Sequence, residues 1–276
     1  MKVTSLETIK AFRAFVICSV VLVLPAVALA QDTVTINDST ASAFMASGPS
    51  GGPDMSTTNF GNAGTLAIAP ASSPKGEFDS VLLFSTSTAV SQFNSMYGIG
   101  DWTITGVQLK LASNFGTTGA APMNGIFNPV AAGSFGIDSL SDTTWTAGNG
   151  GGGGTGGYPA NNEVDFAYIP TLLGSVGSGY DSLGDFTYTP PGNGTYSTYT
   201  LPGSDSILDT TAAGGAVSLY FYAADNNVSY LFNSQQFASN HPELILTATP
   251  TPEPATLALL ATGFGSLLLV RRKMKA

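Results

Sequence analysis

Short stretches in which apolar and polar residues alternate fill most of the chain between residues 31 and 248. Alternation with a period of two is typical of β-strands, and turn residues separate nearly all of these stretches. Glycine and proline are abundant, at 33 and 16 of 276 residues, and we find no sustained helical period in this region. The pattern predicts one all-β domain over residues 31–248, a jelly-roll-like β-sandwich. The expected strands include residues 33–37, 81–84, 107–111, 163–166, 217–222 and 244–246.

Two segments of this domain depart from simple alternation. Residues 81–84 form a continuous apolar run, which is typical of a strand buried on both faces. Residues 148–157 are glycine-rich and predict a flexible surface loop. They lack the lysine and the helix that follow the glycines of a phosphate-binding loop, which excludes that kind of site. No linker is long enough to divide the domain in two.

The N-terminus has the three parts of a secretory signal peptide. Basic residues precede an apolar run at residues 14–24, and Ala28 and Ala30 then form an A-x-A cleavage site. We therefore expect residues 1–30 to be removed and the mature chain to begin at Gln31. An uncleaved signal anchor is the alternative. The one cysteine of the chain lies inside this segment, so disulfides carry no information about the compartment.

The predicted domain is strongly acidic. Residues 31–250 carry 16 Asp and Glu against Lys75 and Lys110, a net charge of −14. Binding of nucleic acid depends on Lys and Arg, so this charge excludes a nucleic-acid partner. It also disfavours anionic lipids and glycans, and it is typical of solubility outside the cell. Calcium bound by carboxylates is the alternative explanation, but no Asp-rich calcium loop occurs, so we expect no metal site and no cofactor.

The C-terminus, residues 249–276, combines a proline-rich segment, an apolar stretch and a basic end. Pro252, Glu253 and Pro254 precede the uncharged residues 255–270, which predict one short transmembrane helix. The positive-inside tendency would keep the basic end in the cytoplasm. This end comprises Arg271, Arg272 and Lys273.

This three-part tail resembles the PEP-CTERM sorting signal of Gram-negative bacteria. The resemblance implies recognition by an exosortase near the Pro-Glu-Pro segment and anchoring in the inner membrane by the C-terminal helix before processing. Release or transfer to the cell surface or extracellular matrix would follow, and members of the family are associated with extracellular polysaccharide and biofilm. An ordinary C-terminal membrane anchor is the alternative.

The domain itself resembles the DNRLRE-type modules, which are related to carbohydrate-binding modules. Residues 232–236 and 241–246 are similar to the terminal signature of these modules, and Trp145 precedes a polar, glycine-rich segment as it does there. Gln236 stands where the signature has Glu. The resemblance implies a jelly-roll β-sandwich that binds glycans.

Catalytic residues are not evident. His241 is the only histidine, and nothing like a nucleophile elbow accompanies it, so we expect a structural role. Glu163 and Asp165 would share one face of a strand, which we expect to be its solvated face. These features predict a protein without enzymatic activity. The alternative is a secreted polysaccharide-active enzyme whose catalytic carboxylates the sequence does not reveal.

Two tyrosines are the candidate glycan-binding residues. Tyr220 and Tyr222 alternate with Val217, Leu219 and Phe221, so they lie together on the opposite face of their strand. Their flat rings could stack on sugars if that face is exposed. The alternative is that they form a second buried layer.

Overall fold

The computed structural model divides the chain into a unit of residues Met1–Ala30 and a unit of residues Gln31–Ala276. The residues that the structure describes belong almost entirely to the second unit. They are 30–114, 127, 133–150, 154–155, 163–174, 180–188, 194–202 and 206–251.

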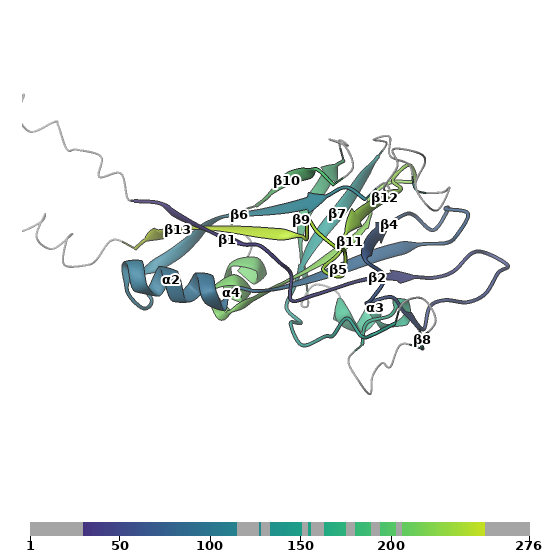
Figure 1. Cartoon of the computed structure of the whole chain (residues 1–276), viewed down its shortest axis with the longest axis horizontal. Coiled ribbons are helices and arrows are strands. Elements are labelled where there is room, and N and C mark those ends of the chain that lie inside the picture. The colour runs from purple at the N-terminus through teal and green to yellow at the C-terminus, as the bar shows by residue number, and fades with distance from the viewer. Residues whose placement is uncertain are drawn as a thin grey trace, which may run out of the picture. The chain divides into compact units, whose positions relative to one another are not determined.

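Two antiparallel sheets form the body of the domain (Figure 1). The four-stranded sheet has the order β1–β13–β6–β10 and the five-stranded sheet has the order β2–β5–β11–β7–β9. The strands of the first are β1 (Asp32–Ile36), β6 (Trp102–Ala112), β10 (Tyr196–Leu201) and β13 (Glu243–Pro250). Those of the second are β2 (Ala41–Ala46), β5 (Phe78–Ser85), β7 (Ser134–Leu140), β9 (Tyr180–Thr187) and β11 (Ala216–Ala223). The chain passes repeatedly from one sheet to the other.

Short strands and helices occupy the connections. The short strands pair as β12 with β4 and as β3 with β8. They are β3 (Thr58–Asn59), β4 (Thr65–Ile68), β8 (Gly154–Thr155) and β12 (Tyr230–Asn233). The helices are α2 (Ser87–Tyr97), the 3-10 turn η1 (Phe166–Tyr168), α3 (Ile169–Leu172) and α4 (Ser206–Gly214).

Alternate residues of the central strands face the space between the two sheets. Val217, Leu219 and Phe221 of β11 belong to the same buried cluster as Leu109 of β6 and Leu246 of β13. Each large side chain in such a cluster contributes about 1.5–3 kcal/mol on burial. The cluster joins the two sheets, so the expected all-β sandwich and the alternation along β11 are confirmed.

The other face of the five-stranded sheet is buried as well. Val81 of β5 and Tyr220 of β11 lie in a second cluster with Trp145 and with side chains of η1 and α3. The indole Nε1 of Trp145 donates a hydrogen bond to Ser218 Oγ at 2.9 Å, within this buried layer. β5 therefore has apolar neighbours on both faces, as its continuous apolar run predicted.

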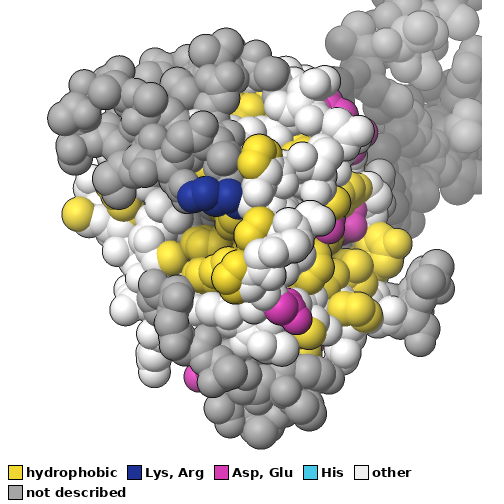
Figure 2. All heavy atoms as spheres, turned by 90° about the vertical axis from the view of Figure 1, so that its right-hand side faces the viewer, with side chains coloured by type: hydrophobic (Ala, Val, Ile, Leu, Met, Phe, Trp, Pro, Cys, Tyr) yellow, Lys and Arg dark blue, Asp and Glu magenta, His cyan; other side chains and the backbone are white. Residues whose placement is uncertain are grey.

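Aromatic side chains form a third cluster beside β2, β4 and β5. Phe44 stacks on Phe60 with ring centroids 4.4 Å apart, and Phe78 meets Phe127 edge to face at 5.3 Å. Both geometries are favourable for aromatic pairs. Figure 2, which faces the right-hand side of Figure 1, shows apolar side chains reaching the surface between a few charged ones.

The prediction of a strand at residues 163–166 is wrong. Glu163 makes one isolated parallel bridge to Thr146, and the chain then turns into η1. Asp165 caps this turn, since its Oδ1 accepts a hydrogen bond from the Tyr168 backbone N–H at 2.9 Å. Asp165 is buried, so the expectation of a solvated carboxylate is also wrong. The capping bond replaces the ladder that a strand would have made.

The two longer helices, α2 and α4, were not expected. α2 has Ala89, Phe93 and Tyr97 spaced by four residues, which places them on one face. Ala89 and Phe93 are buried against the sandwich, and Tyr97 packs against the same cluster. This spacing could have predicted α2, but the apolar pattern covers only three residues and lies between two segments with strand patterns.

The Asn59 side chain and backbone hydrogen bonds hold the described part of the glycine-rich loop. Asn59 Nδ2 donates to the Ala147 carbonyl at 2.7 Å, and Asn59 Oδ1 accepts from the Gly150 N–H at 2.8 Å. Gly61 approaches so closely that a Cβ built on it would lie 1.9 Å from the Ala147 carbonyl oxygen. The chain is therefore anchored at Ala147 and Gly150, and the flexibility of the loop stays a prediction.

Candidate functional site

The domain begins and ends at one place. β1 and β13 are antiparallel neighbours with Asp32 opposite Ala248, so the start of the first lies beside the end of the second. The Tyr97 hydroxyl donates to Asp32 Oδ2 at 2.7 Å, which ties α2 to this start. The Thr251 N–H donates to the Asp101 carbonyl at 2.8 Å, which ties the last described residue to the loop after α2. The chain thus leaves the domain for residue 252 from a defined position.

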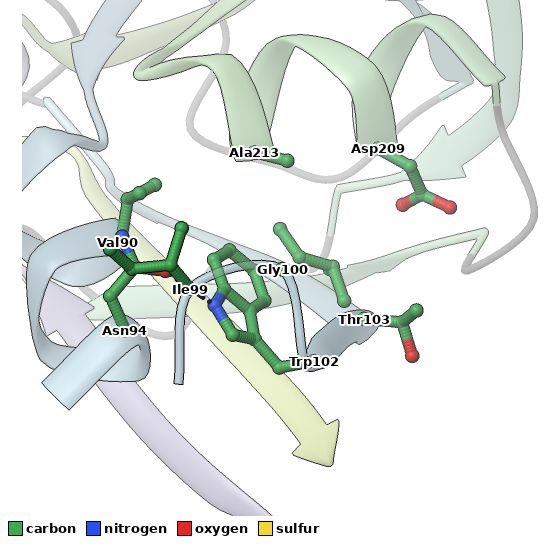
Figure 3. Close-up of a pocket in the computed structure, with 9 residues that line it drawn as sticks. Val90, Asn94, Ile99, Gly100, Trp102, Thr103, Asp209 and Ala213 are labelled. Carbon is green, nitrogen blue, oxygen red and sulfur yellow. Dashed lines mark hydrogen bonds between the residues drawn. The ribbon is translucent and has the colours of Figure 1, made fainter. Parts of the chain in front are cut away.

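A pocket of about 500 Å³ opens beside this position, between α2, α4 and the start of β6 (Figure 3). Its walls are mainly apolar. The indole Nε1 of Trp102 donates to Asn94 Oδ1 at 2.8 Å, which fixes the ring in the wall of the pocket. Asp209 lines the pocket on the α4 side. The lining includes Val90, Asn94, Ile99, Trp102, Asp209 and Ala213.

Sequence reasoning did not find this pocket, because it depends on α2 and on the approach of α4 to that helix. Nor did it find the exposed apolar residues beside it. In the part of the chain that the structure describes, the large apolar side chains that stay exposed are Ile99, 87% exposed, and Met96, 46% exposed. Both lie at or just after the end of α2.

Most of the predicted sorting and cleavage residues lie outside the described residues. Of the predicted signal-peptide site, Ala28 lies outside and Ala30 is the first described residue. The predicted transmembrane helix at residues 255–270 also lies outside. Within the described ranges, no helix has the length and hydropathy needed to cross a membrane. The remaining sorting residues outside the described ranges are Pro252, Glu253, Pro254, Arg271, Arg272 and Lys273.

Tyr220 and Tyr222 do not form an exposed platform. Tyr220 is only 6% exposed, and Tyr222 stacks on it with ring centroids 5.7 Å apart and is half-buried. The Tyr220 hydroxyl donates to Asp79 Oδ2 at 2.7 Å. The cover comes from Trp145 and α3, so this face is the second buried layer and the platform hypothesis is corrected. A ring buried in this way cannot stack on a sugar from solvent.

The same layer holds two buried carboxyl groups with perturbed pKa values. Burial raises the pKa of Asp79 to about 8, although the hydrogen bond from Tyr220 lowers it in part. Burial likewise raises the pKa of Asp138 to about 6. Asp79 is 2% exposed, and its Oδ1 has no hydrogen-bond partner among the described residues. Asp79 is therefore largely protonated near pH 7, and its burial keeps it from solvent.

His241 connects neighbouring segments of the domain through its side chain and its backbone carbonyl. Its Nδ1 lies 3.2 Å from Asp38 Oδ2, and its Nε2 lies 2.7 Å from the Phe237 carbonyl oxygen. The Tyr196 hydroxyl donates to the His241 carbonyl at 2.8 Å. In a catalytic triad Nε2 would face a nucleophilic hydroxyl. Here it faces a backbone carbonyl, which is consistent with the structural role expected.

The described carboxylates do not gather into a metal site. Among these residues, no group of three or more His, Cys, Asp or Glu side chains is placed to hold a metal ion. The Asp225 carboxylate instead stabilises the neighbouring backbone, since it accepts hydrogen bonds from the N–H groups of Ser134 and Asn227. These bonds hold the pKa of Asp225 below its usual value.

Comparison with known proteins identifies the C-terminal segment. A search of curated proteins found no match to the chain. The family model described as the PEP-CTERM protein-sorting motif matches residues 250–273. The match begins at the last residue of β13, directly beside the pocket. The chain therefore carries a PEP-CTERM sorting motif, the recognition signal for exosortase, which marks it as an exported protein anchored through its C-terminus before processing.

Proposed function

We propose that the chain is a cell-surface or extracellular-matrix protein of a Gram-negative bacterium, sorted by exosortase and without catalytic activity, whose sandwich binds polysaccharide. The observation that carries the proposal is the sorting motif at residues 250–273, which starts where the sandwich ends. The whole described domain thus precedes the processing segment. Cleavage near Pro252 would leave the sandwich complete.

The proposal includes removal of residues 1–30 by cleavage after Ala30. The mature chain would begin at Gln31, one residue before β1 begins at Asp32. This cleavage would remove no part of either sheet, which supports the boundary. The acidic domain would then be exported and held by the C-terminal helix until processing.

The finer fold assignment is a jelly roll of the kind found in DNRLRE-type, carbohydrate-binding modules. The strand order supports it. Without the edge strand β2, the eight remaining strands form two sheets with the orders β1–β13–β6–β10 and β5–β11–β7–β9. In this arrangement the first four and the last four strands along the chain each alternate between the sheets, as they do in the two Greek keys of a jelly roll. The fold alone does not specify a ligand, because one architecture serves many functions.

Two features support binding without turnover. His241 faces a carbonyl instead of a nucleophile, and Asp79 and Asp138 lie buried beneath a covering layer. The ligand would be a neutral polysaccharide, since a domain with a charge of −14 repels polyanions. An anionic polysaccharide would need Ca²⁺ from solution to bridge it to the acidic surface.

Affinity electrophoresis of the purified mature protein tests the ligand. We expect gels that contain dextran or another neutral polysaccharide to retard the protein, and gels that contain alginate to do so only with Ca²⁺. Retardation by alginate in the presence of a chelator would contradict the electrostatic argument. Release of reducing ends from any of these polysaccharides would instead show a polysaccharide-active enzyme.

A further inference from the structure

Exposed apolar groups gather at the point where the chain leaves the domain. We use the name exit face for Met96, Ile99 and Trp102 with the pocket between α2 and α4. Ile99 stands at the rim of the pocket (Figure 3), and most of its side chain is in contact with solvent. Exposed apolar groups beside an apolar pocket are typical of a surface that binds a partner.

Covalent geometry places this face close to the processing segment. Thr251 is hydrogen-bonded to Asp101, in the same loop as Ile99, and Pro250 lies opposite Trp102 in the sheet. Four residues of extended chain span at most about 14 Å, so Ala255 cannot lie farther than this from Thr251. Any enzyme that acts on the Pro-Glu-Pro segment must therefore work beside the exit face.

The charges around the exit face favour a protein over a lipid surface as its partner. Asp101 lies in the loop between α2 and β6, and Asp209 lines the pocket. The two basic residues between 31 and 250 are Lys75 and Lys110, and neither lines the pocket. Lys110 is eight residues along β6 from Trp102, about 26 Å away. An anionic membrane attracts basic segments and repels acidic ones.

We propose that the exit face is a second docking surface for exosortase, which would contact it in addition to the Pro-Glu-Pro segment. The partner chemistry that fits the pocket is an apolar side chain against Trp102 and Ile99. Such a contact raises the local concentration of the cleavage segment at the enzyme without any further bond to the tail. This inference rests on the proposed sorting by exosortase.

Processing of the full chain in a host that contains exosortase tests the proposal. Ile99→Ser removes the exposed apolar group, and Ala213→Leu fills part of the pocket from α4. We expect each substitution to slow conversion of the precursor to the processed form about tenfold in a pulse-chase experiment, because burial of one aliphatic side chain is worth about this factor or more. Both sites lie at the surface, so the melting temperature should stay within about 2 °C of the wild-type value.

Thr88→Ser is the matched control. Thr88 is exposed on α2, about 200° around the helix from Val90 and about 12 Å along the helix axis from Met96, so it lies away from the exit face. We expect this variant to be processed at the wild-type rate.

The possible failures have different meanings. If the wild-type chain is not processed at all, the proposed sorting function is overturned together with the docking surface. If the wild type is processed and both Ile99→Ser and Ala213→Leu keep its rate, the docking surface alone is overturned. Flotation of the processed protein with vesicles of phosphatidylethanolamine and phosphatidylglycerol tests the lipid alternative. Binding that Ile99→Ser abolishes would assign the face to lipid and contradict the proposal.

Discussion

Replacing the buried Asp79 with Asn is expected to change how the stability of the domain depends on pH. Asp79 is 2% exposed, and the raised pKa of about 8 compares with 3.8 for an unhindered aspartate. Between these values the folded protein retains a proton that the unfolded chain has lost. The free energy of unfolding must therefore fall as the pH rises through this window.

The magnitude follows from the shift. One group of this kind changes the free energy of unfolding by about 1.4 kcal/mol per pH unit, and a rise in pKa from 3.8 to about 8 corresponds to about 6 kcal/mol in total. This is comparable with the whole stability of a domain, about 5–15 kcal/mol. The stability provided by protonated Asp79 is fully present below about pH 4 and is lost as the pH approaches 8. Asp138, with a pKa of about 6, acts in the same direction over a narrower range.

Guanidinium chloride unfolding of residues 31–251 at pH 4.5 to 8.5 measures the effect. Asn cannot ionise, so the free energy of unfolding of Asp79→Asn should fall much less with rising pH. Near pH 8.5 we expect this variant to be more stable than the wild type. Tyr220→Phe removes the hydrogen bond that lowers the pKa of Asp79, so its decline should extend to higher pH. If the difference in stability between Asp79→Asn and the wild type is the same at every pH, Asp79 does not titrate as the structure implies.

Three further predictions concern the fold. Trp145→Ala should lower the free energy of unfolding by about 3–5 kcal/mol in denaturant titrations, because the indole is buried and donates to Ser218; a loss below 1 kcal/mol would contradict that placement. Gly61→Ala should cost at least about 1–3 kcal/mol, because the new Cβ would collide with the Ala147 carbonyl, and a neutral effect in the same titration would argue against the close approach. Residues 31–250 expressed alone should be soluble and give a far-ultraviolet circular dichroism spectrum dominated by β-structure, whereas a helical spectrum would refute the sandwich.

Strand positions could be predicted because a period of two records which side chains share a face. The alternation of Val217, Leu219 and Phe221 with Tyr220 and Tyr222 correctly separated the two faces of β11. It could not show whether the tyrosine face is exposed. The cover for that face comes from Trp145 and α3, more than 40 residues away in sequence, and only the tertiary structure brings them together.

The expected strand at residues 163–166 failed for a local reason. Val164 and Phe166 alternate with Glu163 and Asp165, but Asp165 forms a cap on the following turn, and this local bond competes with strand pairing.

The sorting tail could be predicted from the sequence because its parts are contiguous. The pocket could not, because α2 and α4 lie more than 100 residues apart and meet only in the fold.

The intact mass of the surface-exposed protein tests sorting by exosortase most directly. The measurement would be made in a Gram-negative host that contains exosortase and in the same host without the enzyme. With exosortase, we expect one mature species that begins at Gln31 and ends near Pro252. Without it, we expect a species that begins at Gln31 and retains Arg271. A surface species that retains Arg271 in the host with exosortase would contradict sorting and reduce the C-terminal segment to a plain membrane anchor.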